Sequence, residues 1–161
     1  MEGNRTPVPI LRTGFSEVDG RFSPDMRWIA YASDESGRYE VYVRVFSESV
    51  GSSETGGKWL ISEGGGMGPR WRKDGKELYY RTPDGKVMAV DITPGGVFQA
   101  GLPKILFQAR PEPPTAWAYA NLIPRWDVTA DGSRFLMVVP GRDTAPTPFT
   151  VVLNWTSLLK K

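Results

Sequence analysis

Histidine and cysteine are both absent from the 161-residue sequence. Without cysteine, the chain can form no disulfide, no thiol nucleophile and no thiolate metal site. Without histidine, it lacks the commonest general base and the commonest zinc ligand. These two absences exclude a serine–histidine catalytic pair, and they favour a protein that binds over one that catalyses. We expect no metal ion and no cofactor.

A marked excess of charge is also missing, because 20 Lys and Arg residues against 18 Asp and Glu residues leave a net charge of +2. No region is strongly basic, so charge supports neither a nucleic-acid nor a membrane-surface partner. The stretch RWRKDGK (residues 70–76) mixes basic and aromatic residues. On an alternating strand its charges would point to both faces, which favours solvated edges. We therefore expect no nucleic-acid partner and no direct membrane contact.

Long apolar runs are lacking as well. No stretch approaches the roughly 20 residues of a membrane-spanning helix, and the beginning, MEGNRTPVPI, has no apolar segment of signal-peptide length. A soluble chain is expected. What is present is a hydrophobic content of 40% together with 18 Gly and 14 Pro, which indicates a folded domain with many turns. No helical periodicity is evident.

One pattern occurs three times, as FSPDMRWIAY (22–31), WRKDGKELYY (71–80) and VTADGSRFLM (128–137). Each has an apolar residue three positions before an aspartate and an apolar pair shortly after it. The aspartates are Asp25, Asp74 and Asp131, separated by 74 − 25 = 49 and 131 − 74 = 57 residues. These intervals resemble the roughly 40 to 50 residues of a β-propeller blade. The longer one contains the proline-rich insert ARPEPPTAWAYANLIP.

Each repeat predicts several strands separated by turns. The expected second strands are 28–32, 78–81 and 135–139, the third strands are 40–46, 87–92 and 149–155, and the fourth strands are 58–62 and 104–107. The second strands are apolar at consecutive positions, whereas a strand with one wet face would alternate apolar and polar residues. Burial on both faces is typical of small sheets stacked against one another around an axis.

The sequence thus predicts an all-β fold, a β-propeller segment of three four-stranded antiparallel blades that is half of a six-bladed ring or part of a larger one. A single domain would span residues 1–161, with blade units at about 20–62, 69–107 and 124–155. Residues 7–13 are interpreted as a stray outer strand that would complete the last blade. Because propellers typically need 4 to 8 blades, self-association or a longer parent chain is expected.

The stretch RFSPDMRWIAYASDESGRYEVYV (21–43) resembles the WD-like repeat of TolB-type β-propellers, and the similarity extends over three consecutive units. With the closing DGSRFLMVVP…TVVLNW, the whole is similar to the C-terminal propeller end of bacterial membrane-anchored serine/threonine kinases. The resemblance implies a sensory or scaffold part of a larger receptor-like protein, located outside the cytoplasm in the periplasm or at the cell surface. No kinase motif is present. Met26 stands where the family turn has glycine, which predicts either a methionine at positive φ or a shifted turn type.

Aspartates could instead form the carboxylate pair of a glycosidase, with Asp74, Asp84, Asp127 and Asp131 as candidates. Most of them lie in turns that repeat at equivalent positions, and such repetition is a structural signature. We interpret Asp25, Asp74, Asp84 and Asp131 as structural turn residues and expect no catalytic residue. The alternative is the propeller domain of a hydrolase, as an accessory to a glycosidase or peptidase.

For binding, we expect the loops 34–39, 63–69, 110–124 and 140–148 to open on one rim of the propeller. Binding sites usually need aromatic or arginine anchors surrounded by adaptable polar groups. The residues that fit are Trp117, Tyr119 and Arg125, with Met67, Arg70 and Asn121 beside them. An alternative for Trp117 and Tyr119 is that they only cover a blade face. The expected function is a non-catalytic module that binds a protein, a peptide or a cell-envelope ligand.

Overall fold

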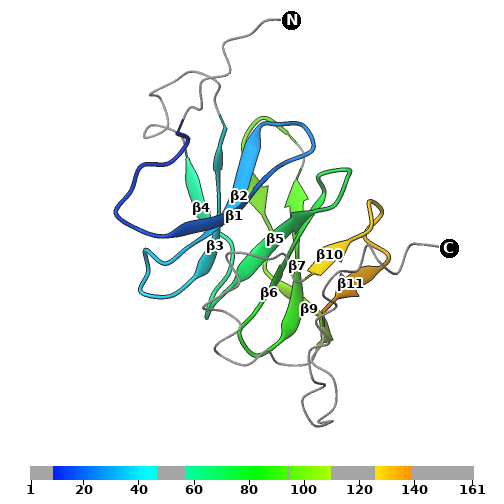
Figure 1. The fold of residues 1–161 in the computed structure, drawn as a ribbon. Helices are drawn as coiled ribbons and strands as arrows, with labels where there is room; N and C mark the ends of the chain where they lie inside the picture. Colours follow the sequence, from blue (N-terminus) through cyan, green and yellow to red (C-terminus); the bar gives the residue numbers. More distant parts are fainter. Residues whose placement is uncertain (1–8, 47–56, 94, 110–125, 139–161) are drawn as a thin grey trace, which may run out of the picture.

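The structure of the chain is a computed structural model, and it describes residues 9–46, 57–93, 95–109 and 126–138. Over these residues the chain forms strands and no helix, in antiparallel sheets of four, five and two strands (Figure 1). The prediction of an all-β, antiparallel fold is therefore confirmed. Within the same ranges no helix is long and apolar enough to cross a membrane.

The first sheet is a meander in which each strand pairs with the next along the chain. Its strands are β1 (Glu17–Phe22), β2 (Trp28–Ser33), β3 (Glu40–Val45) and β4 (Lys58–Leu60). Every residue of β2 is buried, because this strand lies between two others and both of its faces are covered. The strands that the sequence predicted here are confirmed, with ends that differ by one or two residues.

The second sheet has one strand more than the four expected. Its strands are β5 (Met67–Trp71), β6 (Glu77–Arg81), β7 (Lys86–Thr93), β8 (Gln99–Ala100) and β9 (Lys104–Gln108). The long strand β7 pairs with β9 along its first half and with β8 at its end, where Thr93 lies opposite Gln99. The extra strand is β8, which pairs with the end of β7 where that strand continues past its pairing with β9.

Within the described residues, the third sheet consists of a hairpin of β10 (Trp126–Val128) and β11 (Phe135–Met137). The strand expected at 149–155 lies outside the described residues, as does most of the insert before β10. The three sheets follow one another in chain order, and β1 contacts β5, which in turn contacts β10 (Figure 1). The first strands of successive sheets therefore lie next to each other.

The central strands of the second sheet lie between the other two sheets. On one of its faces, Leu78 and Tyr80 join an apolar cluster that includes Trp28 and Ala30 of β2. On the opposite face, Tyr79 joins a second cluster with residues of the third sheet. The prediction that second strands are buried on both faces is confirmed for β2 and β6, and it explains why these strands read as uninterrupted apolar runs.

An aromatic cluster holds the outer part of the first two sheets together. The ring of Trp28 lies 5.6 Å from that of Trp59 and 5.2 Å from that of Phe98, both in edge-on contact. Arg27, next to Trp28, donates hydrogen bonds to the carbonyls of Gly95 and Gly96. The segment before β8 is therefore part of the core, although no strand pattern in the sequence predicted this.

Residues 9–16 form no strand. Within this segment Leu11 packs on the outward face of the first sheet, against a cluster of Ile29, Tyr31 and Tyr42. The residues of the expected strand at 7–13 that the structure describes thus form no strand, and Leu11 among them packs against the first sheet. Its expected partner, residues 150–155, lies outside the described residues.

Candidate functional site

The first strands of the first two sheets carry the same irregularity. The pairing of β1 with β2 shifts between Val18 and Arg21, and the pairing of β5 with β6 shifts between Met67 and Arg70. Residues in the left-handed conformation lie within both shifts, namely Asp19 with φ 55° and Gly68 with φ 64°. Such bulges re-aim the side chains that follow them, and here an arginine follows each one.

The bulge in β5 also sets how closely the third sheet approaches. A Cβ atom on Gly68 would lie 2.6 Å from the indole nitrogen of Trp126. Glycine is therefore needed at this position for its positive φ and for space. The indole nitrogen of Trp126 is buried and has no hydrogen-bond partner among the described residues.

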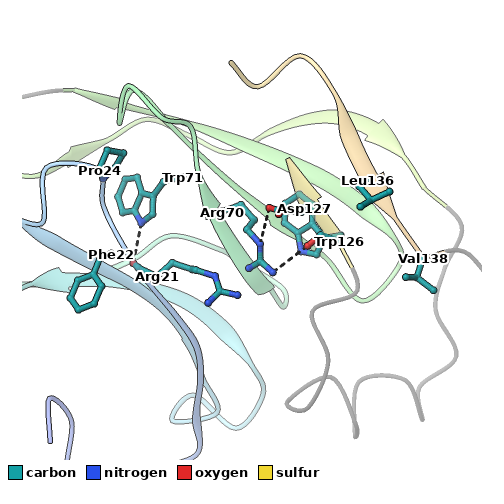
Figure 2. A pocket seen from close by; sticks show the side chains of 9 residues that line it. All are labelled: Arg21, Phe22, Pro24, Arg70, Trp71, Trp126, Asp127, Leu136 and Val138. Carbon is teal, nitrogen blue, oxygen red and sulfur yellow. Dashed lines mark hydrogen bonds and ion pairs between the residues drawn. The ribbon is translucent and has the colours of Figure 1, made fainter. Parts of the chain in front are cut away.

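A cavity of about 580 Å³ opens between the first strands of the three sheets (Figure 2). Its polar lining is made by Arg21 of β1, Arg70 of β5 and Asp127 of β10. Each of these residues lies four positions before the aspartate of its repeat, since 25 − 21, 74 − 70 and 131 − 127 all equal 4. The sheets thus present equivalent backbone positions to one shared space, and two of the three positions hold an arginine.

Arg70 is buried and held in place by backbone carbonyls. Its two terminal nitrogens donate to the carbonyls of Pro69 at 2.8 Å and Trp126 at 3.2 Å. Its Nε lies 3.6 Å from a carboxylate oxygen of Asp127, and its guanidinium lies 5.6 Å from the centre of the Trp126 ring. A fixed guanidinium of this kind is a preorganised donor of hydrogen bonds.

Two positive charges are placed near each other in this cavity. Burial lowers the pKa of the Arg70 guanidinium, and the positive charge of Arg21 acts in the same direction, while Asp19 and Asp127 oppose it. Arginine still stays protonated in proteins. Figure 2 shows both side chains extending into the space between β1 and the strands β5 and β10. The repulsion between them would be relieved by an anion.

Arg21 is held far less firmly than Arg70. Among the described residues, its side chain makes one hydrogen bond, to the carbonyl of Gly20 at 3.3 Å, and no ion pair. Most of its N–H donors are therefore available to a ligand. The strand itself is anchored, because the indole of Trp71 donates to the carbonyl of Arg21.

The rest of the cavity wall is apolar and open to solvent. Phe22 is 43% exposed, Leu136 is 75% exposed and Val138 is 60% exposed, and all of them line the cavity together with Pro24 and Trp71. Large exposed apolar side chains in one concave place are typical of surfaces that contact a partner. The cavity thus combines two arginines with an apolar rim.

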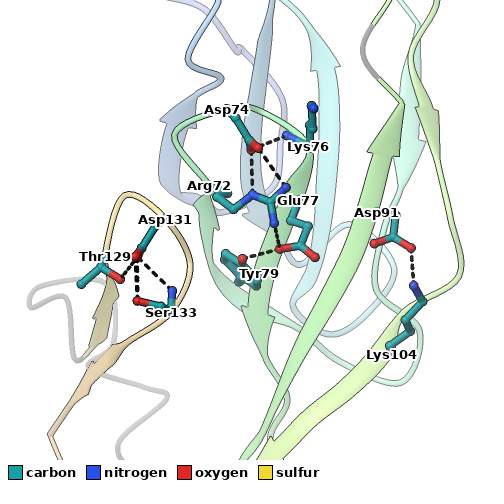
Figure 3. A network of polar contacts seen from close by, with 10 residues as sticks. All are labelled: Arg72, Asp74, Lys76, Glu77, Tyr79, Asp91, Lys104, Thr129, Asp131 and Ser133. Atoms are coloured by element: carbon teal, nitrogen blue, oxygen red, sulfur yellow. Dashed lines mark hydrogen bonds and ion pairs between the residues drawn. The ribbon is translucent and has the colours of Figure 1, made fainter.

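The aspartates of the repeats lie in the turns and accept hydrogen bonds there. In the third sheet, Asp131 accepts from the Thr129 hydroxyl at 2.6 Å and from the Ser133 amide at 3.0 Å (Figure 3). These bonds lower the pKa of Asp131 to about 2, and the bond from Thr129 has the largest effect. Asp25 accepts in the same way from Ser23 at 2.6 Å and from the amide of Arg27 at 3.2 Å.

The second sheet uses an ion pair for the same purpose. Arg72 forms a two-pronged contact with Asp74, at 2.7 and 2.9 Å, and also reaches Glu77 (Figure 3). The Arg72 hydrogen bond lowers the pKa of Asp74. At the next turn, Lys86 and the hydroxyl of Thr82 lower the pKa of Asp84. A carboxyl group with a lowered pKa is a poor general acid at neutral pH.

Of the binding residues expected from the sequence, Trp117, Tyr119, Asn121 and Arg125 lie outside the described residues. Met67 is 4% exposed, so its side chain lies in the interior. Arg70 lines the cavity. Two of the expected rim loops, 34–39 and 63–69, lie against each other, because the Gly66 amide donates to the Tyr39 carbonyl at 2.9 Å.

Sequence reasoning missed Arg21, Phe22, Leu136 and Val138 as lining residues. A signal was available in the sequence, because arginine recurs four positions before Asp25 and before Asp74. Residues at equivalent positions of a repeat point to the same side of successive sheets. A charge that recurs on the first strand of successive repeats is therefore a hint of a shared polar lining.

Among the described residues, no group of three or more acidic side chains is placed to hold a metal ion. Comparisons with protein-family models and with curated proteins found no match to this chain.

Proposed function

We propose that this chain is a non-catalytic binding module, built as a β-propeller segment of three blades, that captures a protein, a peptide or a cell-envelope ligand. The observation that carries the proposal is the cavity between β1, β5 and β10, where Arg21 and Arg70 meet exposed apolar side chains. Arginine and aromatic anchors in a concave surface are the usual composition of a recognition site.

Support for the propeller architecture comes from the way the sheets follow one another. Each sheet begins with a strand beside the first strand of its neighbour, and successive sheets pack face to face through apolar clusters. A meander that stacks on the next meander in chain order is the arrangement of propeller blades. The repeated aspartate turns give each unit the same entry into its second strand.

Support for a non-catalytic role comes from the carboxylates. The turn aspartates are occupied by hydrogen bonds or ion pairs, as with Asp74 and Arg72. Asp127, which does line the cavity, lies beside Arg70, and Arg21 and Arg70 are the other charged groups of the lining. A glycosidase would need a second carboxyl group across the same space.

By its resemblance to receptor-like propellers, we place the module outside the cytoplasm as part of a larger protein or assembly.

The proposal is tested by selecting random-sequence peptides displayed on phage against the immobilised chain, and by measuring the affinity of those that are enriched. Phe22→Ala is expected to weaken the selected peptides by about tenfold or more, because Phe22 lines the cavity. The matched control is Phe15→Ala, since Phe15 is 52% exposed and lies outside the cavity lining. Failure to enrich any peptide, or turnover of glycosides or peptides by the chain, would overturn the proposal.

A second arm tests the residues that precede β10. Trp117→Ala and Tyr119→Ala are expected to leave folding intact and to weaken the selected peptides, with Asn121 and Arg125 as further contacts. A loss of several kcal/mol of stability in both variants would instead identify these rings as core residues. The first arm is independent of that outcome, because Phe22 belongs to β1.

A further inference from the structure

We propose that the cavity between β1, β5 and β10 binds a carboxylate group of a peptide ligand between the guanidinium groups of Arg21 and Arg70. This inference rests on the proposed binding function and names the chemistry that its site recognises. The carboxylate is either the C-terminus of the ligand or the side chain of an aspartate or glutamate with apolar neighbours.

The first argument is geometric. Each arginine follows a bulge at the same place in its strand, within the register shifts 18–21 and 67–70. The two side chains extend into one space (Figure 2). Planar guanidinium groups recognise carboxylates through paired, charge-assisted hydrogen bonds. A carboxylate between them would accept from both and would neutralise their mutual repulsion.

The second argument concerns which donors remain available. Arg70 uses two of its nitrogens on the carbonyls of Pro69 and Trp126, which fixes its position. Its Nε faces Asp127 at 3.6 Å, an ion pair too long for a hydrogen bond. Arg21 makes one side-chain hydrogen bond within the described residues, to Gly20. Arg70 thus supplies a fixed charge with its remaining N–H donors, and Arg21 supplies most of the donors that are not yet used.

The third argument concerns the surroundings of the charge. Phe22, Leu136 and Val138 form an exposed apolar rim, which suits the side chains on either side of the bound group. Asp127 is 71% exposed and carries the negative charge nearest to Arg70 in the lining. It competes with a ligand for that guanidinium, so its removal should strengthen binding of a carboxylate.

The experiment titrates the chain with short peptides and follows the indole N–H resonances of Trp71 and Trp126 by NMR. One peptide is N-acetyl-Leu-Phe-Leu with a free C-terminus, and its amide is the neutral control. The second is N-acetyl-Leu-Asp-Leu amide, with the Asn version as its control. Each carboxylate is compared with its own neutral partner, so the two sources of the carboxylate are distinguished. Inorganic phosphate is titrated in parallel.

At least one carboxylate peptide is expected to bind about tenfold more tightly than its neutral partner, the size of one charge-assisted hydrogen bond. Arg21→Gln should abolish that preference, and Asp127→Asn should increase it severalfold. The control is Arg134→Gln, which removes an exposed arginine outside the cavity lining. Arg21 is chosen over the buried Arg70 because its loss leaves the backbone bonds of the site in place.

Equal binding of charged and neutral peptides, or a preference that survives Arg21→Gln, would overturn the carboxylate assignment while leaving the binding module intact. Absence of binding by every carboxylate peptide at millimolar concentration would also overturn it, as would tighter binding of inorganic phosphate. The phage selection judges the proposed function separately, because it makes no assumption about the charge of the ligand.

Discussion

The indole nitrogen of Trp71 donates a hydrogen bond to the backbone carbonyl of Arg21, at 3.1 Å. This bond joins the first strand of the second sheet to the first strand of the first sheet, and it holds the backbone that carries one of the two cavity arginines. Trp71→Phe keeps an aromatic ring and removes the donor. We expect the free energy of unfolding to fall by about 1 to 2 kcal/mol, from the lost hydrogen bond and the smaller ring.

The matched control for this prediction is Trp59→Phe. Trp59 is half-buried and makes ring contacts with Trp28 and Phe98, but its indole makes no hydrogen bond in the part of the chain that the structure describes. Chemical denaturation of both variants separates the two contributions. A cost for Trp71→Phe that does not exceed the cost for Trp59→Phe would show that the inter-sheet hydrogen bond adds nothing.

A second prediction concerns the contact between the turn of the third sheet and Tyr79 of β6. Gly132 has φ 75°, and a Cβ atom there would overlap the Tyr79 hydroxyl. Gly75, at the equivalent place in the second sheet, has φ 71° and has only Pro24 within reach, at 3.8 Å. Gly75→Ala should cost about 1 kcal/mol for its backbone conformation. Gly132→Ala should cost roughly 2 to 4 kcal/mol, because overpacking is added.

Thermal or denaturant unfolding of the two glycine variants decides this prediction. Equal losses of stability in the two variants would mean that the turn at Gly132 does not lie in close contact with Tyr79. A larger loss for Gly132→Ala that shrinks when Tyr79→Phe is added would support the contact, because the second change removes the overlapping hydroxyl.

Much of the fold could be predicted because the repeat encodes it locally. An apolar residue, a turn with aspartate and an apolar run specify a hairpin, and this pattern located β2, β6 and β11. The pairing of β7 with β8 was not predictable, since it depends on how far β7 extends past its pairing with β9. The position of Phe98 in the aromatic cluster is likewise a tertiary effect.

The candidate site could be predicted only in small part. Arg70 was named as a binding residue, but only as a neighbour of Trp117, Tyr119 and Arg125. The cavity instead depends on the bulges of β1 and β5, and in β1 the residue with positive φ is Asp19 and not the glycine that follows it. The juxtaposition of Arg21 with Arg70 requires strands nearly fifty residues apart to lie together, which a local pattern does not specify.

A third prediction follows from the backbone of Met26. Its φ of 58° confirms the positive value expected from the turn, and the equivalent turn positions in the other two repeats hold glycine, at 75 and 132. A side chain in this conformation costs on the order of 1 kcal/mol. Met26→Gly should therefore stabilise the fold by a few tenths to about 1 kcal/mol, since the greater freedom of glycine in the unfolded chain offsets part of the gain.

The denaturation midpoint of Met26→Gly is compared with that of Met26→Ala, which shortens the side chain and keeps the strain. Met26 is 52% exposed, so little packing is lost in either variant. A midpoint that falls on the glycine substitution would contradict the prediction.

A fourth prediction concerns acid stability. The hydrogen bonds from Thr129 and Ser133 lower the pKa of Asp131 from its ordinary 3.8 to about 2 in the folded chain. A group whose pKa is lowered by folding stabilises the fold above its unfolded pKa and loses that effect as the pH falls through its folded pKa. The contribution of Asp131 should thus be complete above about pH 5 and should disappear between roughly pH 4 and pH 2.

The measurement is the difference in unfolding midpoint between the wild-type chain and Asp131→Asn, taken at pH 6 and again near pH 2. The other turn aspartates titrate in both proteins, so their effects cancel in the difference. A difference that stays constant over this pH range would mean that the Thr129 hydroxyl does not favour the charged form of Asp131.

The last prediction is self-association. Phe135 and Met137 of β11 pack toward the second sheet, whereas Leu136 between them is 75% exposed and Val138 is 60% exposed. Strand geometry places these two side chains on the opposite face of β11, where they border the open cavity and no further sheet covers them within the described residues. We expect a second copy, or the rest of a larger ring, to pack against this face beside the ligand cavity. Light scattering should therefore report a dimer, and Leu136→Glu should shift it toward the monomer.

The control is Leu102→Glu, because Leu102 is 84% exposed and lies between β8 and β9. A wild-type chain that is a stable monomer and binds no hydrophobic dye would contradict the prediction.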